Sequence, residues 1–112
     1  MQIGFLLSVF LAVLCICHGK DIIKDCQEEY EVTEAEVDPI SKKAPIESLS
    51  LILKCYAKCT IAHLLGDDGK LAVERVDKQK GLKCRKRYDN LVITNEEVFC
   101  DYGAKILYCL NE

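Results

Sequence analysis

The sequence predicts an all-α domain that is cross-linked by disulfide bonds. In residues 20–112 apolar side chains recur at helical spacing, and no stretch alternates apolar and polar residues for long enough to make a convincing strand. Six cysteines remain once an N-terminal segment with the pattern of a signal peptide is set aside. These observations together indicate one small helical domain that depends on its disulfides.

Residues 1–19 are predicted to be a signal peptide. Residues 3–16 form an apolar run, and Cys17 and Gly19 place small side chains at the two positions that a signal peptidase reads. Cleavage after Gly19 would leave a secreted, extracellular domain of residues 20–112. A membrane anchor is the alternative, but the run is short for a bilayer span and lacks a basic flank.

The remaining cysteines indicate three disulfides, because an even number in a small exported chain is usually fully paired. They are Cys26, Cys55, Cys59, Cys84, Cys100 and Cys109. A chain of this size buries only a modest core. Each bridge contributes roughly 2–4 kcal/mol, against an expected free energy of unfolding of roughly 5–15 kcal/mol. Loss of one bridge is therefore expected to be serious.

The most apolar stretch of this domain, residues 49–65, predicts a central and mostly buried helix. It is expected to begin near Ser48 and to end at Gly66, which can take the left-handed conformation of a helix C-terminal cap. Cys55 and Cys59 would lie almost above one another, but their side chains would not point at each other as a disulfide requires. Each cysteine is therefore expected to bridge to a different distant segment. The same face carries Leu49, Ile52, Tyr56 and His63.

Shorter helices are predicted on both sides of this central helix. Residues 20–30 and 82–88 would form helices that carry Cys26 and Cys84, and residues 71–76 open a short amphipathic segment. Capping patterns predict further helix starts at Thr33 with Glu36, at Asp38 with Pro39, and at Thr94 with Glu97.

The last predicted helix, which ends near Leu110, has one apolar face. Gly103 has no side chain, so a neighbouring element or a ligand can approach the backbone closely at that point. Cys100 and Cys109 are nine residues apart, which turns them to opposite edges of the face. They cannot pair with each other and are expected to tie the helix down on two sides. The face consists of Phe99, Tyr102, Gly103, Ile106 and Leu110.

Charge is unevenly distributed along a chain whose formal net charge is -3. Acidic residues are dense in residues 28–38, and basic residues are dense in residues 78–87. An exported acidic chain without a broad basic surface is not expected to bind nucleic acid. We favour solvated faces that attract each other over a surface that binds a partner.

The residues do not indicate an enzyme, a cofactor or a metal. An even set of disulfide-bonded cysteines leaves no thiol for a catalytic pair with His63, and serine nucleophile motifs are missing. Cys55, Cys59 and His63 are spaced so that they fit a metal site, but export favours disulfides. His63 is expected to be a core histidine, with a pH-sensitive packing or ligand contact as the second interpretation.

The surplus of apolar and aromatic side chains around two clamped helices has two interpretations of equal weight. One is an ordinary filled core. The other is a core that is braced from outside, so that its centre stays hollow and takes an apolar ligand.

The cysteine spacing resembles the six-cysteine signature of the insect odorant-binding proteins, the family of pheromone-binding and general odorant-binding proteins. Its specific intervals are the three residues between Cys55 and Cys59 and the eight between Cys100 and Cys109. The segment LLGDDGKLAVE, residues 64–74, is similar to the turn between the third and fourth helices of that family. The resemblance covers essentially all of residues 20–112.

This resemblance implies a compact fold of about six short helices around a hydrophobic cavity. It also implies three interlocked disulfides, Cys26–Cys59, Cys55–Cys100 and Cys84–Cys109. The interval between Cys59 and Cys84 is short for the family, so the cavity is expected to be smaller or more open. The chain ends three residues after Cys109, so a release mechanism that uses a C-terminal tail does not carry over.

The function expected from this resemblance is a secreted carrier, without catalysis, that reversibly binds a small hydrophobic ligand such as an odorant, a pheromone or a lipid-like molecule. Tyr56, Tyr102 or Tyr108 is expected to donate an orienting hydrogen bond. A membrane receptor or a protein is the further partner considered, and the carrier is expected to be a monomer or a weak homodimer. The predicted lining comprises Ile52, Tyr56, Leu64, Leu71, Val76, Phe99, Tyr102 and Ile106.

The alternative is a venom, salivary or reproductive-fluid protein of the same fold that acts by protein–protein interaction without a ligand.

Overall fold

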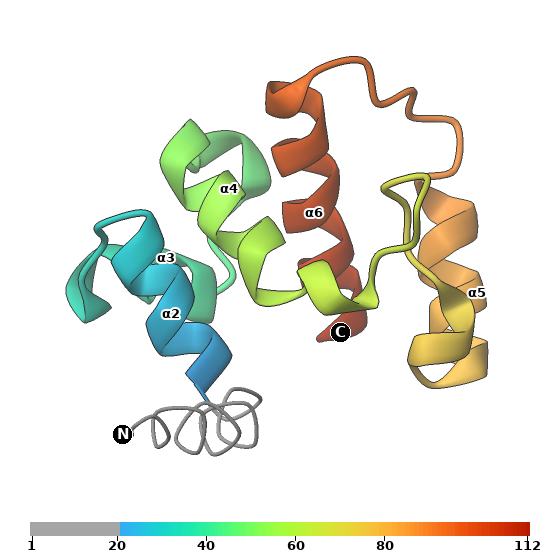
Figure 1. Ribbon diagram of the computed structural model, residues 1–112, viewed down its shortest axis with the longest axis horizontal. Helices are drawn as coiled ribbons and strands as arrows, with labels where there is room; N and C mark the ends of the chain where they lie inside the picture. The colour runs from blue at the N-terminus through green and yellow to red at the C-terminus, as the bar shows by residue number, and fades with distance from the viewer. Residues whose placement is uncertain (1–20) are drawn as a thin grey trace, which may run out of the picture.

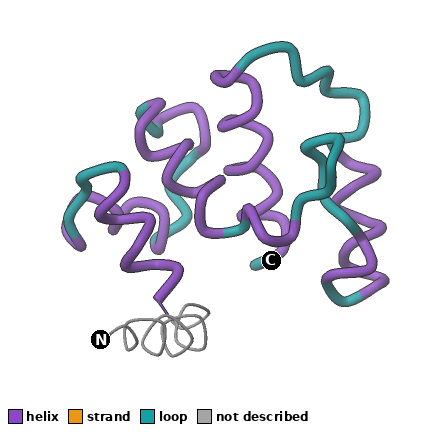
Figure 2. Tube along the Cα trace, in the orientation of Figure 1, coloured by secondary structure: helices purple, strands orange, loops and turns teal. Residues whose placement is uncertain are grey.

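The computed structural model describes residues 21–112, and it confirms the all-α prediction for this part of the chain (Figures 1 and 2). Its five α-helices are one fewer than the six expected. They are α2 (Ile22–Glu29), α3 (Glu34–Ser41), α4 (Leu51–Thr60), α5 (Lys78–Arg87) and α6 (Glu96–Leu110). Three 3-10 turns, η2 (Ile46–Ser48), η3 (Ala62–Leu64) and η4 (Val73–Arg75), lie in the connections. The predicted signal peptide, residues 1–19, lies outside the described residues.

No helix within residues 21–112 is long and apolar enough to cross a bilayer.

Helices α4 and α6 pack against each other at the centre of the structure and share its most extensive contact between two elements (Figure 1). Gly103 makes this contact possible. A Cβ atom at Gly103 would lie 2.5 Å from the Cβ of Lys58 and 2.8 Å from its Cα, which is closer than atoms pack. The close approach predicted at Gly103 is therefore confirmed, and the neighbour is the backbone of α4.

Three disulfides cross-link the described residues, and their pairing is the one that the family resemblance implies. Cys26–Cys59 joins α2 to α4, Cys55–Cys100 joins α4 to α6, and Cys84–Cys109 joins α5 to α6. The central and last helices each hold two cysteines that bridge to different elements, as predicted. The outer helices α2 and α5 are thus tied to opposite members of the central pair.

Side-chain caps begin four of the helices, including α5, where Asp77 Oδ2 accepts from the Lys80 N–H at 3.0 Å. The capping box predicted at the start of α3 is confirmed: the Glu36 N–H donates to Thr33 Oγ1 at 3.2 Å, and the Thr33 N–H donates to Glu36 Oε1 at 2.8 Å. Ser50 caps α4. The box predicted at Thr94 is displaced by one residue, because Asn95 caps α6 by accepting from Val98 N–H at 2.9 Å. Asparagine is the stronger N-cap of the two neighbours.

One predicted helix end and one predicted helix start are wrong. Helix α4 stops at Thr60 rather than Gly66. Two β-branched residues follow each other there, and the Thr60 hydroxyl donates to the Ala57 carbonyl at 2.7 Å, which competes with continued helix. The predicted new start at Pro39 is also wrong, since this proline lies within α3, which ends at Ser41.

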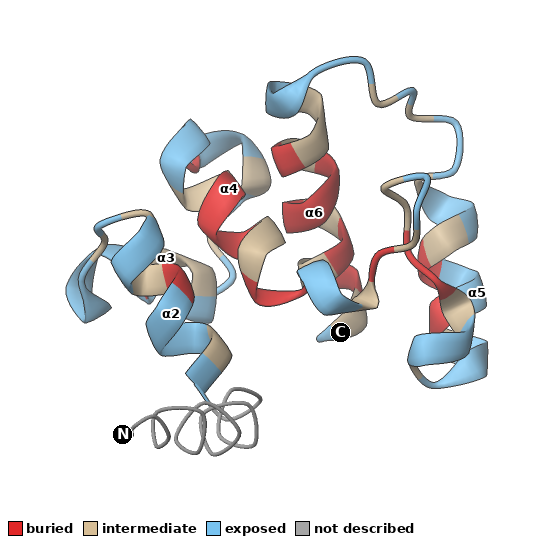
Figure 3. Ribbon diagram, viewed as in Figure 1, coloured by how far each residue is buried: buried red, intermediate tan, exposed pale blue. Residues whose placement is uncertain are grey.

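The buried side chains form two clusters, one on each side of the central pair. Figure 3 shows the buried residues concentrated on α4, α6 and the connection between α4 and α5. The outer faces of α2, α3 and α5 are exposed. The larger cluster lies between α5 and α6 and contains Ile61, Leu65, Leu71, Cys84, Tyr102, Ile106 and Cys109. The smaller cluster lies between α2, α3 and α4 and contains Cys26, Val37 and Tyr56.

An ion-pair network also joins α4 to α6. Lys54 of α4 and Lys105 of α6 both lie beside the Asp101 carboxylate, at 3.0 and 2.9 Å. Partial burial raises the pKa of Asp101, but the hydrogen bonds from Lys105 and Lys54 outweigh this effect and hold the pKa below its usual value. Folding is therefore linked to deprotonation of Asp101.

We predict that Gly103→Ala lowers the free energy of unfolding by about 1–3 kcal/mol, because α4 and α6 must separate to admit the methyl group. Urea unfolding followed by circular dichroism measures the change. Gly66→Ala is the matched control, since a Cβ atom there would meet ordinary contacts of 3.4 Å or more. The control is expected to stay within about 0.5 kcal/mol of the unchanged protein. An equal response of the two variants would contradict the role given to Gly103.

We predict that Asp101→Asn weakens the acid dependence of stability. The folded-state pKa of Asp101 is lowered, so its contribution is present above the unfolded pKa of about 3.9 and is lost as the pH falls through the lower folded value. The variant should be less stable than the unchanged protein at pH 7, and the difference should shrink below about pH 4. Urea midpoints measured from pH 7 to pH 2 test this, and a difference that stays constant with pH would refute it.

Candidate functional site

The structure brings six of the eight predicted lining residues together, but as a packed core. Three of them, Leu71, Tyr102 and Ile106, belong to the larger cluster, and Leu64, Val76 and Phe99 are partly buried and pack against it. The side chains of Leu71, Tyr102 and Ile106 are completely buried. Four pockets lie on the surface of residues 21–112, and none of these six side chains lines any of the four. The predicted lining is therefore contiguous in space, but these pockets lie elsewhere.

The two other predicted lining residues lie outside that cluster. Tyr56 is buried in the smaller cluster and lines a pocket between α3 and α4. Ile52 is 55% exposed near the start of α4 and lines a different pocket. Of the eight residues, these two each line one of the four pockets.

All three tyrosines expected to orient a ligand have hydrogen-bond partners within the fold: two bond to the backbone, and Tyr56 bonds to the Gln27 side chain. The Tyr102 hydroxyl accepts from the buried Leu71 N–H at 2.9 Å, and the Tyr108 hydroxyl donates to the Ala44 carbonyl at 2.7 Å. Burial raises the pKa of both hydroxyls. Tyr56 and Tyr108 each line a pocket, whereas Tyr102 lies in the packed core.

The pocket beside Tyr56 has a volume of about 210 Å³, and four helices contribute to it. We call it the Tyr56 pocket. Its lining is mainly apolar, with three polar side chains among them. Helix α2 contributes Ile23, α3 contributes Glu34, Val37, Ile40 and Ser41, α4 contributes Tyr56 and Thr60, and α6 contributes Leu107.

Helical spacing explains why these residues share one cavity. Glu34, Val37 and Ser41 are three and four residues apart, which places them on one face of α3. Tyr56 and Thr60 are likewise four residues apart on α4. The Cys26–Cys59 disulfide fixes α2 against α4 beside them. The position of the pocket is thus held by a covalent bond as well as by packing.

Polar groups gather around the Tyr56 hydroxyl. Burial raises the pKa of Tyr56, a hydrogen bond with Gln27 opposes this shift, and the Glu34 carboxylate reinforces it. Gln27 Nε2 in turn donates to Glu34 Oε1 at 2.8 Å. The tyrosine is therefore neutral at pH 7, and its hydroxyl can donate or accept a hydrogen bond.

The prediction of a core histidine is wrong. Helix α4 ends before His63, which lies exposed in η3, away from the helical register of Cys55 and Cys59. The metal site considered for these three residues is also wrong, because both cysteines are in disulfides. A cluster of Cys55, Cys100 and Glu96 has the spacing of metal ligands, but its two sulfurs are bonded to each other and offer no thiolate.

Most residues of the Tyr56 pocket were not predicted from the sequence. A signal was present, since Val37 and Ile40 are three residues apart on what is now the inner face of α3. The helix break expected at Pro39 separated the two residues in the prediction. Leu107 of α6 carried no comparable signal, because its contribution depends on where α3 packs.

We predict that Tyr102→Phe lowers the free energy of unfolding by about 1–3 kcal/mol, because it leaves the buried Leu71 N–H without its acceptor. Tyr108→Phe removes a hydroxyl that is only partly buried and serves as the control, with an expected loss of about 0.5–1.5 kcal/mol. Thermal unfolding of the two variants tests the order. A Tyr102→Phe protein as stable as the unchanged one would show that the amide finds another partner.

No protein-family model matches the chain, and comparisons with curated protein sequences and with solved structures found no match. A conclusion about function therefore depends on the residues and on their arrangement. The two observations that bear on it are the interlocked pairing of the six cysteines and the apolar pocket beside Tyr56.

Proposed function

We propose that this protein is a secreted carrier that reversibly binds a small hydrophobic molecule in the Tyr56 pocket, without catalysis. The observation that carries the proposal is this apolar pocket, which four helices form. Disulfides join two of these helices, α2 and α6, to a third, α4. Odorants, pheromones and lipid-like molecules are the ligand classes that the family resemblance favours. Three disulfides in a small chain are typical of an extracellular protein.

Burial of apolar ligand surface would provide the affinity. Each buried CH₂ group contributes about 0.8 kcal/mol. The pocket volume of about 210 Å³ lies below the range of about 300–1,000 Å³ that is common for drug-sized ligands. The ligand is therefore small, or part of it remains exposed. The Tyr56 hydroxyl supplies a hydrogen bond that orients a polar group on it, and the Thr60 oxygen, whose proton is donated to the Ala57 carbonyl, can accept another.

The small volume also favours a second candidate. A venom, salivary or reproductive-fluid protein that acts through protein contacts needs no cavity, and the half-exposed Ile52 lies on a surface open to such contacts. The two candidates differ in whether the folded protein takes up an apolar molecule.

Displacement of a fluorescent naphthylamine probe tests the carrier. The full-length sequence is expressed in a secretory host, and the oxidised protein is purified from the medium. We expect saturable uptake in the micromolar range, displacement by some members of a panel of fatty acids, alcohols, esters and terpenoids, and loss of uptake when the disulfides are reduced. A folded, helical protein that takes up no probe would refute the carrier and favour the second candidate.

We predict that Ser41→Phe weakens probe binding by about tenfold or more, because the added ring fills the Tyr56 pocket and displaces roughly two buried CH₂ groups of the probe. Ser41 is exposed at the end of α3, so the change spares the core. Lys42→Phe adds the same ring next to it but outside the pocket, and it should bind the probe as the unchanged protein does. Equal binding by all three proteins would place the ligand elsewhere.

A further inference from the structure

The two charged runs of the sequence lie at opposite ends of the structure: α2 and α3 at one end and α5 at the other (Figure 1). Residues 28–38 contain six acidic residues and no basic one, and residues 78–87 contain six basic residues and no acidic one. Within residues 21–112 no ion pair or hydrogen bond joins the two runs. The expectation that these faces attract each other within one molecule is therefore wrong.

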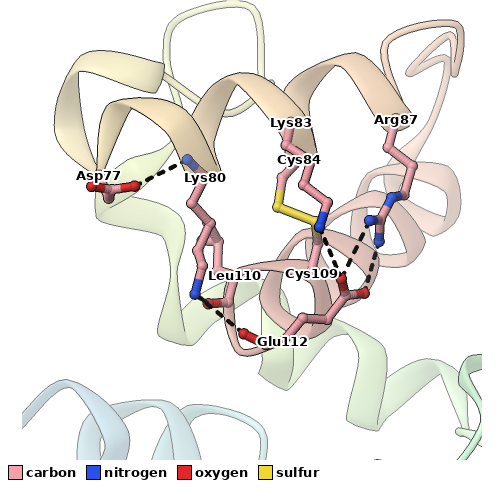
Figure 4. Close-up of a disulfide and its surroundings, with 8 residues drawn as sticks. All are labelled: Asp77, Lys80, Lys83, Cys84, Arg87, Cys109, Leu110 and Glu112. Carbon is pink, nitrogen blue, oxygen red and sulfur yellow. Dashed lines mark hydrogen bonds and ion pairs between the residues drawn. A yellow bond between two sulfur atoms is a disulfide. The ribbon is translucent and has the colours of Figure 1, made fainter.

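Four of the six cations of α5 have partners close by in the same molecule. Arg85 pairs with Asp68 at 3.1 Å. Three others hold the last residues of the chain beside the Cys84–Cys109 disulfide, as Figure 4 shows. In that group Arg87 and Lys83 lie 2.7 and 3.9 Å from the Glu112 carboxylate, and Lys80 donates to the Leu110 carbonyl at 3.0 Å.

The other two cations of α5 flank an exposed leucine. Lys78 and Lys86 are exposed and make no ion pair or hydrogen bond among the residues that the structure describes. Leu82 lies midway between them and is 50% exposed. Residues four apart are neighbours on a helix surface, so the three side chains form one stripe about 12 Å long. We call it the basic stripe.

The opposite end carries a pocket of complementary character. Its volume is about 260 Å³, and it lies between the α2–α3 link and the start of α4. Four apolar or aromatic side chains line it together with two glutamates that are exposed to solvent. We call it the acidic pocket. Its lining comprises Tyr30, Glu31, Val32, Glu36, Ser50, Ile52 and Leu53.

The end of α2 places Glu31 at the rim of the acidic pocket. Glu31 has a φ of 53°, the left-handed conformation that is common just after a helix C-terminus. The Glu31 N–H donates to the Glu28 carbonyl and the Val32 N–H to the Gln27 carbonyl, so this turn is held by backbone hydrogen bonds. It fixes where the Glu31 backbone lies beside the apolar side chains of the pocket.

We propose that the protein associates with a second copy of itself, head to tail, through these two surfaces. Leu82 of one copy enters the acidic pocket of the next, and Lys78 and Lys86 pair with the carboxylates of Glu31 and Glu36 at its rim. Charge complementarity favours this occupant. The stripe presents two unpaired cations around one apolar side chain, and the pocket presents two carboxylates around several apolar side chains.

The geometry makes the assembly open-ended. The two surfaces differ and lie at opposite ends, so each copy retains one unused surface after pairing, and the contact can repeat along a chain of molecules. Exposed ion pairs contribute little binding energy and are screened by salt, so the association is weak and sensitive to salt. The acidic pocket shares no lining residue with the Tyr56 pocket, so the proposal stands independently of the carrier function.

Sedimentation velocity of the oxidised protein, secreted from the full-length sequence, tests the association. At low salt the weight-average mass should rise with protein concentration. At about 0.5 M NaCl, where charges are screened within a few ångströms, it should return to that of the monomer. A mass that stays monomeric at all concentrations, or an association that salt strengthens, would overturn the proposal.

Two variants then test the surfaces, and neither changes a buried residue. Lys78→Gln with Lys86→Gln removes the cations of the stripe, and Glu31→Gln with Ile52→Gln alters the pocket. Each variant alone should associate about tenfold more weakly than the unchanged protein. An equal mixture should form a heterodimer and nothing larger, because each variant keeps one intact surface. A mixture as monomeric as the separate variants would contradict a head-to-tail contact.

Lys24→Gln with Lys42→Gln is the matched control. It removes the same net charge from exposed lysines at the acidic end of the molecule. Association should be retained or strengthened, because the acidic end becomes more negative. If this control loses association as fully as the variant of the stripe, net charge rather than the basic stripe governs it, and the proposal fails. Circular dichroism confirms that each variant is folded.

Discussion

The close approach of α4 to α6 fixes the centre of the structure, and the positions of the other helices follow from it. Gly103 removes the side chain that would hold the helices apart, and the Cys55–Cys100 disulfide joins them where their Cα atoms are 4.5 Å apart. The Lys58 side chain of α4 also contacts α6. Its ammonium lies 4.1 Å from the centre of the Phe99 ring and pairs with the Glu96 carboxylate at 2.7 Å. Packing, a covalent bond and charge therefore fix the same pair of helices.

The other helices take their positions from this pair. One disulfide ties α2 to α4 and another ties α5 to α6, so the chain builds one hydrophobic cluster on each side of the centre. The cluster beside α6 is larger, and Leu71, Tyr102 and Ile106 in it are completely buried. The cluster beside α4 is smaller and adjoins the Tyr56 pocket. A carrier built in this way would hold its ligand beside the lesser core, where ligand exchange does not require the larger core to open.

The same topology separates the charges. Because α2 and α3 attach to one side of the central pair and α5 to the other, the acidic and basic runs cannot neutralise each other within a molecule. Local partners neutralise some of the basic side chains, as Glu112 does for Arg87, and the Arg87 guanidinium holds the pKa of Glu112 below its usual value. The charges left over at each end favour contact between molecules over contact within one.

The all-α class, the capping box at Thr33 and the close approach at Gly103 could be predicted from the sequence, because periodicity, capping and side-chain size act over a few residues. Helix geometry also predicted that Cys55 and Cys59 bridge to separate segments, while the pairing itself was predicted only from a resemblance of the cysteine spacing to that of a family. The end of α4 before His63, and the meeting of Val37, Tyr56 and Leu107 at one pocket, could be seen only in the folded structure. These outcomes depend on which faces of distant helices pack together, and spacing along the chain does not specify that.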